Sequence, residues 1–299
     1  MPEMVPLPGG YSGETFLATS AGERSVVRIY AGRSAARGAE AAHVDAAVLR
    51  LVRGLVPVPD VLEVRRADDT SGTPALLVTR WLEGTRLDEV LPVVDDDAAA
   101  SLGRAVGTVV ARLAQMPMPR IGLFVDSDLT IGALPPGGED LPAWVSKHTA
   151  TGPLAAWEAL DRAALHDLAE RAQDLIDPSQ RVCLVHGDLN PKNVLVDAEA
   201  GEVRGVVDWE FAHAGSPFSD LGNLLRFDRR PAFADAVLAA YVDQVVDAPP
   251  DTLARARAAD LFALIELAAR RGQSPVADRA HEQLRAVAQT GDLHATVPR

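Results

Sequence analysis

The residues best suited to do chemistry lie in one short segment, residues 185–197. It reads Val-His-Gly-Asp-Leu-Asn-Pro-Lys-Asn-Val-Leu-Val-Asp, so Asp188 precedes Asn193 by five positions, and a later apolar run ends in Asp208. Transfer of a phosphoryl group needs a carboxylate facing the attacking hydroxyl, and oxygen ligands for the magnesium that bridges the phosphates. The spacing therefore predicts that Asp188 orients and deprotonates an acceptor hydroxyl, while Asn193 and Asp208 hold Mg²⁺.

The alternative interpretation of this segment is that His186 is a core histidine and that the acidic residues only form turns. Four fixed residues, His, Gly, Asp and Asn, should recur by chance in a chain of this length about once in a thousand. Turn-forming acids also need not keep this order relative to an asparagine and a second apolar strand. The pattern therefore favours a catalytic loop over a set of turns.

This stretch resembles the aminoglycoside phosphotransferase family, whose members are relatives of the protein kinases. The resemblance is carried by the His-Gly-Asp loop, by the asparagine five residues further on, by the pair Asp208-Trp209, and by residues 215–224, and it extends over about residues 5–230. It implies an α+β, two-lobed protein-kinase-like fold, with a small β-rich N-lobe and a larger, mostly helical C-lobe. It also implies ATP (or GTP) and Mg²⁺ as cofactors of an enzyme that phosphorylates an alcohol group.

The resemblance further implies a nucleotide cradle in the N-lobe, and a glycine-rich turn near the N-terminus supplies it. Glycines let the backbone approach phosphates, and hydroxyl groups add donors. The residues expected here are Gly9, Gly10, Ser12, Gly13 and Thr15. An ordinary glycine hairpin is the alternative.

A basic residue on the next strand should hold the nucleotide phosphates, and the chain departs from the family here. Kinases of this kind use a lysine paired with a helix glutamate, but the only two lysines, Lys147 and Lys192, lie far downstream. Arg28 occupies the matching place, and it can bind phosphate bidentately. By spacing, its expected helix partner is Asp45, with Glu40 as the second choice. The departure leaves a weakly active or inactive kinase, or a solvated Arg28, as alternatives.

Residues 79–84 resemble the family's hinge between the lobes. There the backbone rather than the side chains would bind the adenine edge, through the carbonyl of Arg80 and the N–H of Leu82. The predicted organisation is a nucleotide-binding lobe over residues 1–80, a hinge over 81–84, and a catalytic and substrate-binding lobe over 85–299.

Hydrophobic spacing supports this division. Residues 15–19, 25–30, 61–64 and 75–79 have the composition of strands, and residues 35–53 have helical spacing. Beyond residue 86, helical patterns dominate residues 96–115, 154–176, 231–246 and 252–270, and only residues 181–186, 194–196 and 203–208 are typical of strands. A small sheet carrying one helix, followed by a helical region, is therefore expected.

Composition limits the classes of function. The chain has 299 residues, 47% of them apolar, and a formal net charge of −13. Such an acidic chain repels nucleic acid, and no apolar run is long enough to span a membrane. A single cysteine, Cys183, excludes an internal disulfide framework, and the N-terminus does not resemble a signal peptide. We therefore expect a cytoplasmic protein, as a monomer or homodimer, that binds neither nucleic acid nor membrane.

The acceptor is the part of the function that the sequence specifies least. The acidic balance suits a small cationic molecule, and Glu210 and Glu266 are the acidic residues expected to bind it. For Glu266, the alternative partner is Arg270, one helical turn further on. An antibiotic such as an aminoglycoside, made harmless by phosphorylation, is the leading expectation. The alternatives are a metabolic kinase for an amino alcohol such as choline or ethanolamine, and a kinase-like module that binds without catalysis.

Other enzyme classes fit poorly. Only eleven residues separate Asp208 from Asp220, which is too few for the activation segment of a protein kinase. The chain has no Gly-Lys pair of a P-loop, no Gly-x-Ser-x-Gly elbow and no His-Glu-x-x-His zinc motif.

Overall fold

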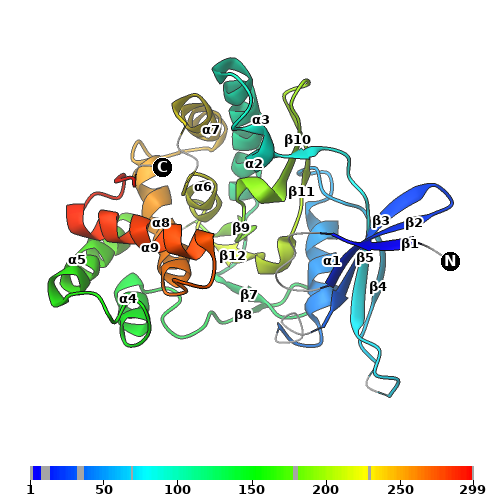
Figure 1. Cartoon of the computed structure of the whole chain (residues 1–299), viewed down its shortest axis with the longest axis horizontal. Coiled ribbons are helices and arrows are strands. Elements are labelled where there is room, and N and C mark those ends of the chain that lie inside the picture. The colour runs from blue at the N-terminus through cyan, green and yellow to red at the C-terminus, as the bar shows by residue number, and fades with distance from the viewer. Residues whose placement is uncertain are drawn as a thin grey trace.

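The computed structural model describes residues 3–7, 14–31, 37–68, 70–177, 181–227 and 230–297. The first eighty residues contribute an antiparallel sheet in the order β1-β2-β3-β5-β4. Its strands are β1 (Glu3–Pro6), β2 (Glu14–Ser20), β3 (Glu23–Tyr30), β4 (Val61–Arg65) and β5 (Ala75–Arg80). Every second residue of β5 is buried, as expected for a sheet with one covered face. The helix α1 (Ala41–Val52) packs against β4 and β5 (Figure 1).

The rest of the chain is mostly helical. Its helices are α2 (Leu87–Val90), α3 (Asp96–Ala114), α4 (Leu141–Thr149), α5 (Ala159–Ile176), α6 (Ser219–Leu224), α7 (Pro231–Gln244), α8 (Thr252–Ala268) and α9 (Pro275–Thr290). The side chains of Asp95, Asp140 and Ser274 accept hydrogen bonds from the first turns of α3, α4 and α9, which fixes where these helices begin.

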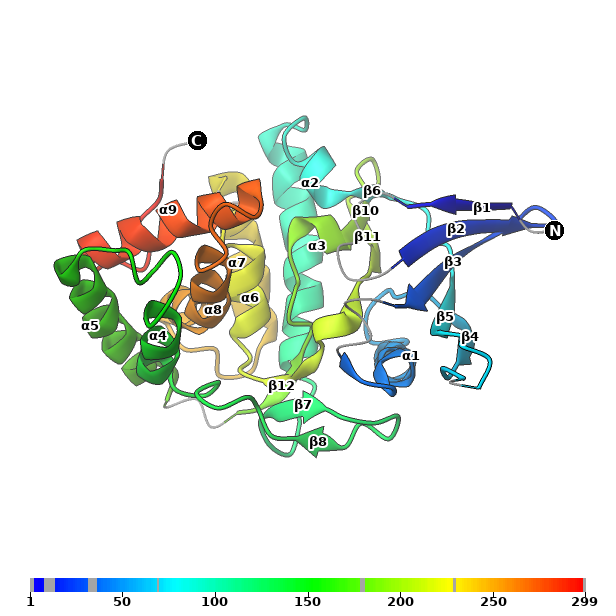
Figure 2. The same ribbon diagram turned by 60° about the horizontal axis from the view of Figure 1, so that its bottom comes forward.

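Two small antiparallel sheets lie where the two lobes meet. One has the order β11-β10-β6 and the other β8-β7-β12-β9. Their strands are β6 (Thr85–Arg86), β7 (Gly122–Phe124), β8 (Ile131–Gly132), β9 (Cys183–Val185), β10 (Val194–Asp197), β11 (Glu202–Val206) and β12 (His213–Gly215), and two short 3₁₀ turns, η2 (Pro191–Asn193) and η3 (Trp209–Phe211), follow β9 and β11. In Figure 2, β10 and β11 stand between the N-lobe sheet and the helices of the C-lobe.

The predicted fold class is confirmed, with corrections in detail. The expectation of only three β-like segments beyond residue 86 is wrong, because β7, β8 and β12 are also strands. These strands are two or three residues long, which is too short for alternation to show in the sequence. The helices α2, α4, α6 and α9 were also not expected. The buried face of α9 combines three alanines with His281 and Gln283, so it carries few large apolar side chains.

Two groups of buried apolar side chains form the core. The first runs from α1 and β5 through α3 to α6 and α7, and so crosses from one lobe to the other. The second lies among α4, α5, α8 and α9. Within the described ranges, none of the helices combines the length and the apolar character that crossing a membrane would require.

Candidate functional site

A buried histidine fixes the loop that follows β9. The strand is buried throughout and ends at Val185, so His186 enters the core with no exposed surface. Its Nδ1 accepts from the N–H of Asp188 (3.2 Å), so Nε2 carries the ring proton and donates to the carbonyl of Val207 (3.0 Å). Burial lowers the pKa of His186 to about 4, which keeps the ring neutral at physiological pH. His186 is therefore a core histidine that also shapes the loop.

The start of the loop is held by an aspartate from α6. The two carboxylate oxygens of Asp220 accept from the N–H of His186 (2.8 Å) and of Gly187 (3.0 Å). Gly187 has φ +84°, and a Cβ at this position would come within 2.3 Å of the carbonyl oxygen of Phe211. Only glycine fits there. The loop is therefore fixed from both sides before Asp188 is reached.

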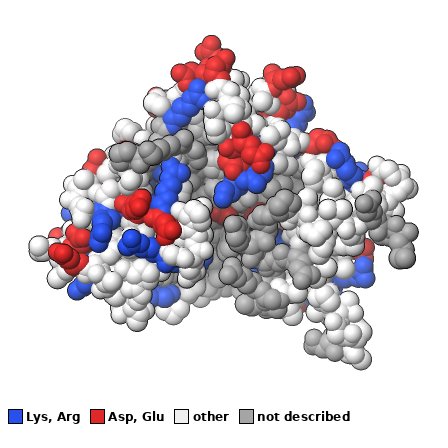
Figure 3. All heavy atoms as spheres, in the orientation of Figure 1, with Lys and Arg blue, Asp and Glu red and all other residues white. Residues whose placement is uncertain are grey.

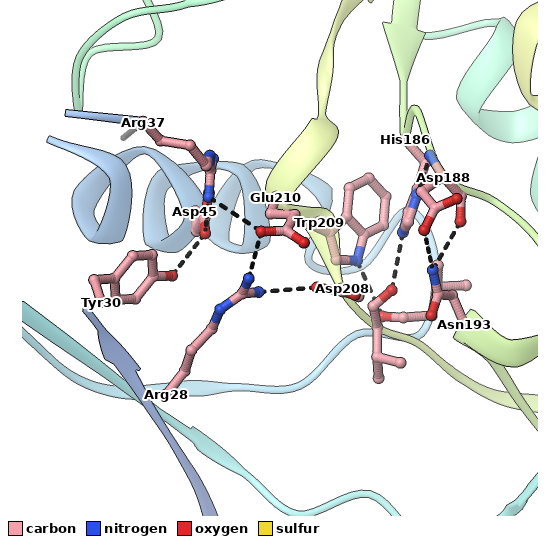
Figure 4. A network of polar contacts seen from close by, with 12 residues as sticks. Arg28, Tyr30, Arg37, Asp45, His186, Asp188, Asn193, Asp208, Trp209 and Glu210 are labelled. Carbon is pink, nitrogen blue, oxygen red and sulfur yellow. Dashed lines mark hydrogen bonds and ion pairs between the residues drawn. The ribbon is translucent and has the colours of Figure 1, made fainter. Parts of the chain in front are cut away.

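Asp188 itself is held by two amides, of which Figure 4 shows that of Asn193. Its Oδ1 accepts from Nδ2 of Asn190 (2.8 Å) and its Oδ2 from Nδ2 of Asn193 (3.1 Å). Burial raises the pKa of Asp188 to about 6, and the charge of Asp208 adds to that rise, while the amides and Arg226 oppose it. A carboxylate in a fixed orientation with a pKa near neutrality is suited to accept a proton.

The hairpin of β10 and β11 brings the two predicted magnesium ligands to the same place. The carbonyl of Asn193 accepts from the N–H of Val207 (2.9 Å), so Asp208 follows directly at the loop. Since Nδ2 of Asn193 points to Asp188, its side-chain oxygen accepts no hydrogen bond from any residue that the structure describes. The Asp208 side chain is 37% exposed. One amide oxygen and one accessible carboxylate fit Mg²⁺, which takes its other ligands from phosphate and water.

Arg28 reaches this place from β3. Its guanidinium donates through one terminal nitrogen to Oδ1 of Asp208 (2.9 Å) and through the other to Oε2 of Glu210 (2.5 Å). Burial alone would lower the pKa of Arg28, but Asp208, Tyr30 and Glu210 raise it above its ordinary value. The arginine is therefore a permanent cation at the predicted phosphate site.

The structure contradicts the predicted pairing of Arg28 with Asp45. The carboxylate of Asp45 instead binds both terminal nitrogens of Arg37 (2.7 and 2.9 Å). The second choice, Glu40, pairs with Arg66. The prediction failed because spacing along the chain does not show that Arg37, which precedes α1, lies beside Asp45 and pairs with it in place of Arg28.

The two acidic residues expected to bind a cationic acceptor are engaged elsewhere. Glu210 is only 7% exposed and pairs with Arg28, because η3 turns its side chain toward the N-lobe sheet. Glu266 pairs with Arg270, the alternative that helical spacing offered. These pairs do not test whether either carboxylate contacts an acceptor, so that role of Glu210 and Glu266 stays a prediction.

Most of the predicted nucleotide cradle lies outside the described residues. This holds for Gly9, Gly10, Ser12 and Gly13. Thr15 is described: it lies in β2 opposite Arg28, and its carbonyl accepts from the N–H of Leu7 (2.8 Å). Its role in binding phosphate stays a prediction.

The predicted hinge lies between β5 and β6. The N–H of Arg80 donates to the carbonyl of Asp60 (2.8 Å), and the N–H of Trp81 donates to that of Arg24 (3.3 Å). Leu82 comes next, and its N–H donates to no residue within the described ranges. This is the pattern expected of a backbone edge that binds a base.

Three residues of the network were not predicted. Asn190 also accepts from the N–H of Lys192 (3.0 Å), and the Asn190-Pro191 dipeptide is the sequence signal that could have found it. Tyr30 donates its hydroxyl to Asp45 (2.6 Å). Neither Tyr30 nor Arg37 carries a local signal, because their contacts depend on the packing of α1 against the sheet.

A cavity of about 530 Å³ lies within the C-lobe, and none of the predicted site residues lines it. It is lined by Leu91, Pro92, Val94, Arg226, Phe227, Arg230, Phe233, Arg279, Gln283, Thr296 and Val297. No carboxylate belongs to this lining among the described residues, and Arg226 and Arg230 bind Asp260 and Asp96. The cavity wall therefore contains guanidinium groups rather than acids.

Sequence comparison relates the chain to known proteins. A sequence model of the phosphotransferase enzyme family (APH) matches residues 3–258. The mouse (Mus musculus) acyl-CoA dehydrogenase family member 10 is 25% identical over 73% of this chain, which spans only 20% of that protein's length. An aminoglycoside 3'-phosphotransferase of Streptomyces ribosidificus is 29% identical over 65% of this chain and 69% of its own.

Solved structures show the same fold. The ternary complex of a thermostable mutant of aminoglycoside phosphotransferase APH(4)-Ia with ADP and hygromycin B has a TM-score of 0.68 at 16% identity, over 97% of this chain and 94% of that one. The GDP complex of aminoglycoside 2'-phosphotransferase-IIIa has a TM-score of 0.70 at 18% identity, over 97% and 93% of the two chains.

Proposed function

Because the chain belongs to the phosphotransferase enzyme family, we propose that it phosphorylates a hydroxyl group of a small molecule at the expense of a nucleoside triphosphate. The observation that carries the proposal is the Asp188 carboxylate, which Asn190 and Asn193 orient at 2.8 and 3.1 Å. Asp208 is near enough to raise the pKa of Asp188. This is the arrangement of proton acceptor and oxygen ligands that phosphoryl transfer requires.

In this reaction Asp188 binds the acceptor hydroxyl and takes its proton. The hydroxyl oxygen forms a bond to the γ-phosphorus, and the bond from that phosphorus to the β–γ bridging oxygen breaks, so a nucleoside diphosphate leaves. Asn193 and Asp208 are the residues that would hold Mg²⁺, which neutralises phosphate charge when bound. Arg28 donates to the nucleotide phosphates.

The nucleotide binds in the N-lobe, against the backbone of Arg80 and Leu82. Solved neighbours in complex with ADP and GDP support a purine nucleotide. The N–H of Leu82, which has no acceptor among the described residues, supports binding of the base edge at this position. Both ATP and GTP are therefore tested.

An aminoglycoside is the first acceptor to test. The support is the relative named aminoglycoside 3'-phosphotransferase and the neighbour bound to hygromycin B. Phosphorylation of such an antibiotic would make this a resistance enzyme.

An amino alcohol is the second acceptor to test, because the sequence left an amino alcohol kinase open beside an antibiotic kinase.

The test is nucleotide turnover with Mg²⁺ against aminoglycosides and amino alcohols, each with ATP and with GTP, and with the product confirmed by the mass of one added phosphate. We expect one class to respond, and Asp188→Asn to reduce turnover by roughly 10²–10⁴-fold while it leaves nucleotide affinity near that of the wild type. Turnover that survives in Asp188→Asn would contradict the assignment. A wild-type protein that binds nucleotide but phosphorylates no acceptor would favour the non-catalytic module.

A further inference from the structure

Charged side chains alternate in sign across the junction between the lobes (Figure 4). The order, read from α1 toward the magnesium ligands, is Asp45, Arg37, Glu210, Arg28 and Asp208. A kinase-like site needs a carboxylate that positions the phosphate-binding cation, and the expected one, Asp45, binds Arg37 instead. Another residue must therefore position Arg28.

Among the residues that the structure describes, the carboxylates of Asp208 and Glu210 contact Arg28, and they differ in burial. The Asp208 side chain is 37% exposed and the Glu210 side chain only 4%. An accessible carboxylate is free to exchange its partner for a ligand from solvent. A buried carboxylate that loses its cation is left desolvated and uncompensated, which is costly. Glu210 is thus the partner that Arg28 keeps.

The surroundings hold both members of this pair in place. Arg37 lies on the far side of Glu210, with its nitrogen 3.9 Å from Oε2. The ring of Tyr30 lies under the Arg28 guanidinium, 5.4 Å from ring centroid to Cζ. Glu210 is therefore placed between two cations.

Resting on the proposed function, we infer that Glu210 is the positioning residue of the phosphate-binding arginine. It holds one terminal nitrogen of Arg28, and the other, which donates to Asp208 in this structure, is the one that turns to the nucleotide phosphates. A strand arginine and a carboxylate two residues beyond the magnesium aspartate thus replace the strand lysine and helix carboxylate. Asp45 supports this pair only indirectly, through Arg37.

The experiment measures ADP binding by titration calorimetry, with Mg²⁺ and with EDTA. Glu210→Gln should weaken ADP binding roughly ten- to a hundredfold in both, since a hydrogen bond to a charged group is worth about 1.5–3 kcal/mol. Arg28→Gln should weaken it by a similar factor, and the double variant little more than either alone. In turnover, Glu210→Gln should raise the KM for nucleotide and leave the KM for the acceptor unchanged.

Controls separate positioning from general stability. Glu63→Gln removes an exposed carboxylate that pairs with Arg65 on β4, and it should leave ADP affinity unchanged. Glu210→Asp keeps the charge but withdraws it by one methylene. We expect it to give an intermediate affinity, which also covers the case in which Glu210→Gln does not fold.

Each result of the ADP-binding measurements either supports or overturns the role of Glu210. Wild-type affinity in a folded Glu210→Gln or Glu210→Asp protein overturns the inference, as do additive losses in the double variant. If the wild-type protein itself binds no nucleotide, the proposed function fails instead. The two failures are therefore distinguishable.

Discussion

Two opposing influences set the protonation of Asp188. Burial raises its pKa to about 6, while the amides of Asn190 and Asn193 stabilise the charged form and lower it. The carboxylate is therefore ionised at neutral pH, yet it is a stronger base than an exposed aspartate. These are the properties needed by a group that takes a proton from an alcohol.

The activity should lose its acid limb where Asp188 becomes protonated. Above pH 6 the carboxylate is free to accept a proton, and below it the site is blocked, so kcat/KM should fall about tenfold per pH unit below about 6. Asn190→Ala removes a hydrogen bond that lowers the pKa of Asp188, so its acid limb should move to higher pH. Lys192→Ala, an exposed change in the same loop, serves as the control. If the acid limb of the Asn190→Ala variant lay at the same pH as in the wild type, this limb would not report the protonation of Asp188.

The sequence predicted the loop residues better than their partners in the N-lobe. Asp188, Asn193 and Asp208 are set by local spacing and one hairpin, and the structure brings the first two into direct contact. The predicted pairing of Asp45 with Arg28 was wrong, because Asp45 pairs with Arg37, a residue that precedes α1. A contact between elements cannot be read from spacing within one of them.

The helices α3 and α7 approach one another closely. A Cβ on Gly103 would lie 2.6 Å from the carbonyl oxygen of Phe233, and one on Gly107 would lie 2.5 Å from that of Val237. These glycines let one helix rest directly on the backbone of the other. From α7, the hydroxyl of Tyr241 donates to the carbonyl of Pro217 (2.8 Å), just before α6, the helix that carries Asp220.

Gly103→Ala should therefore destabilise the protein, by about 1–3 kcal/mol, because the added methyl group overpacks the contact. In an exposed helix the same change would stabilise by up to about 1 kcal/mol, so the sign of the effect tests the contact. Urea unfolding followed by circular dichroism measures it. Arg104→Ala, the exposed neighbour on α3, should stay within about 0.5 kcal/mol of the wild type. A stabilised Gly103→Ala protein would mean that the helices are further apart.

At this scale the sequence predicted α1, α3, α5, α7, α8 and the longer strands, because their apolar periodicity is extended enough to show, but it missed the 16-residue helix α9. It did not predict β7, β8 and β12, which have two or three residues each and depend on one another. β12 pairs with both β7 and β9, so it supports the strand that leads into the loop carrying Asp188. The missed strands are therefore those that position the site.

Charged side chains of both signs are spread over one face of the molecule. Figure 3 shows Lys and Arg side chains interspersed with Asp and Glu on the face it presents. Many of these are ion pairs between neighbours, which contribute little individually to stability. The net charge of −13 therefore does not by itself identify an acceptor site.

The two apolar clusters should unfold together, because α8 joins them. Ala256 and Ala259 belong to the first cluster, while Ala258 and Leu261, on the same helix, belong to the second. Because α8 contributes side chains to both clusters, unfolding of one cluster would also remove part of the packing of the other. Nucleotide binding at the junction of the lobes should therefore stabilise the distant helices α5 and α9 as well.

Hydrogen exchange followed by mass spectrometry tests this coupling. MgADP at a hundred times its dissociation constant adds about 2.7 kcal/mol to the free energy of unfolding, and the slowest amides of α3 and of α9 should gain protection equally. Asp208→Asn should lose the part of this gain that depends on Mg²⁺, in both helices at once. If α3 gained protection and α9 did not, the second cluster would be an independent unit, and α8 would not transmit the stabilisation.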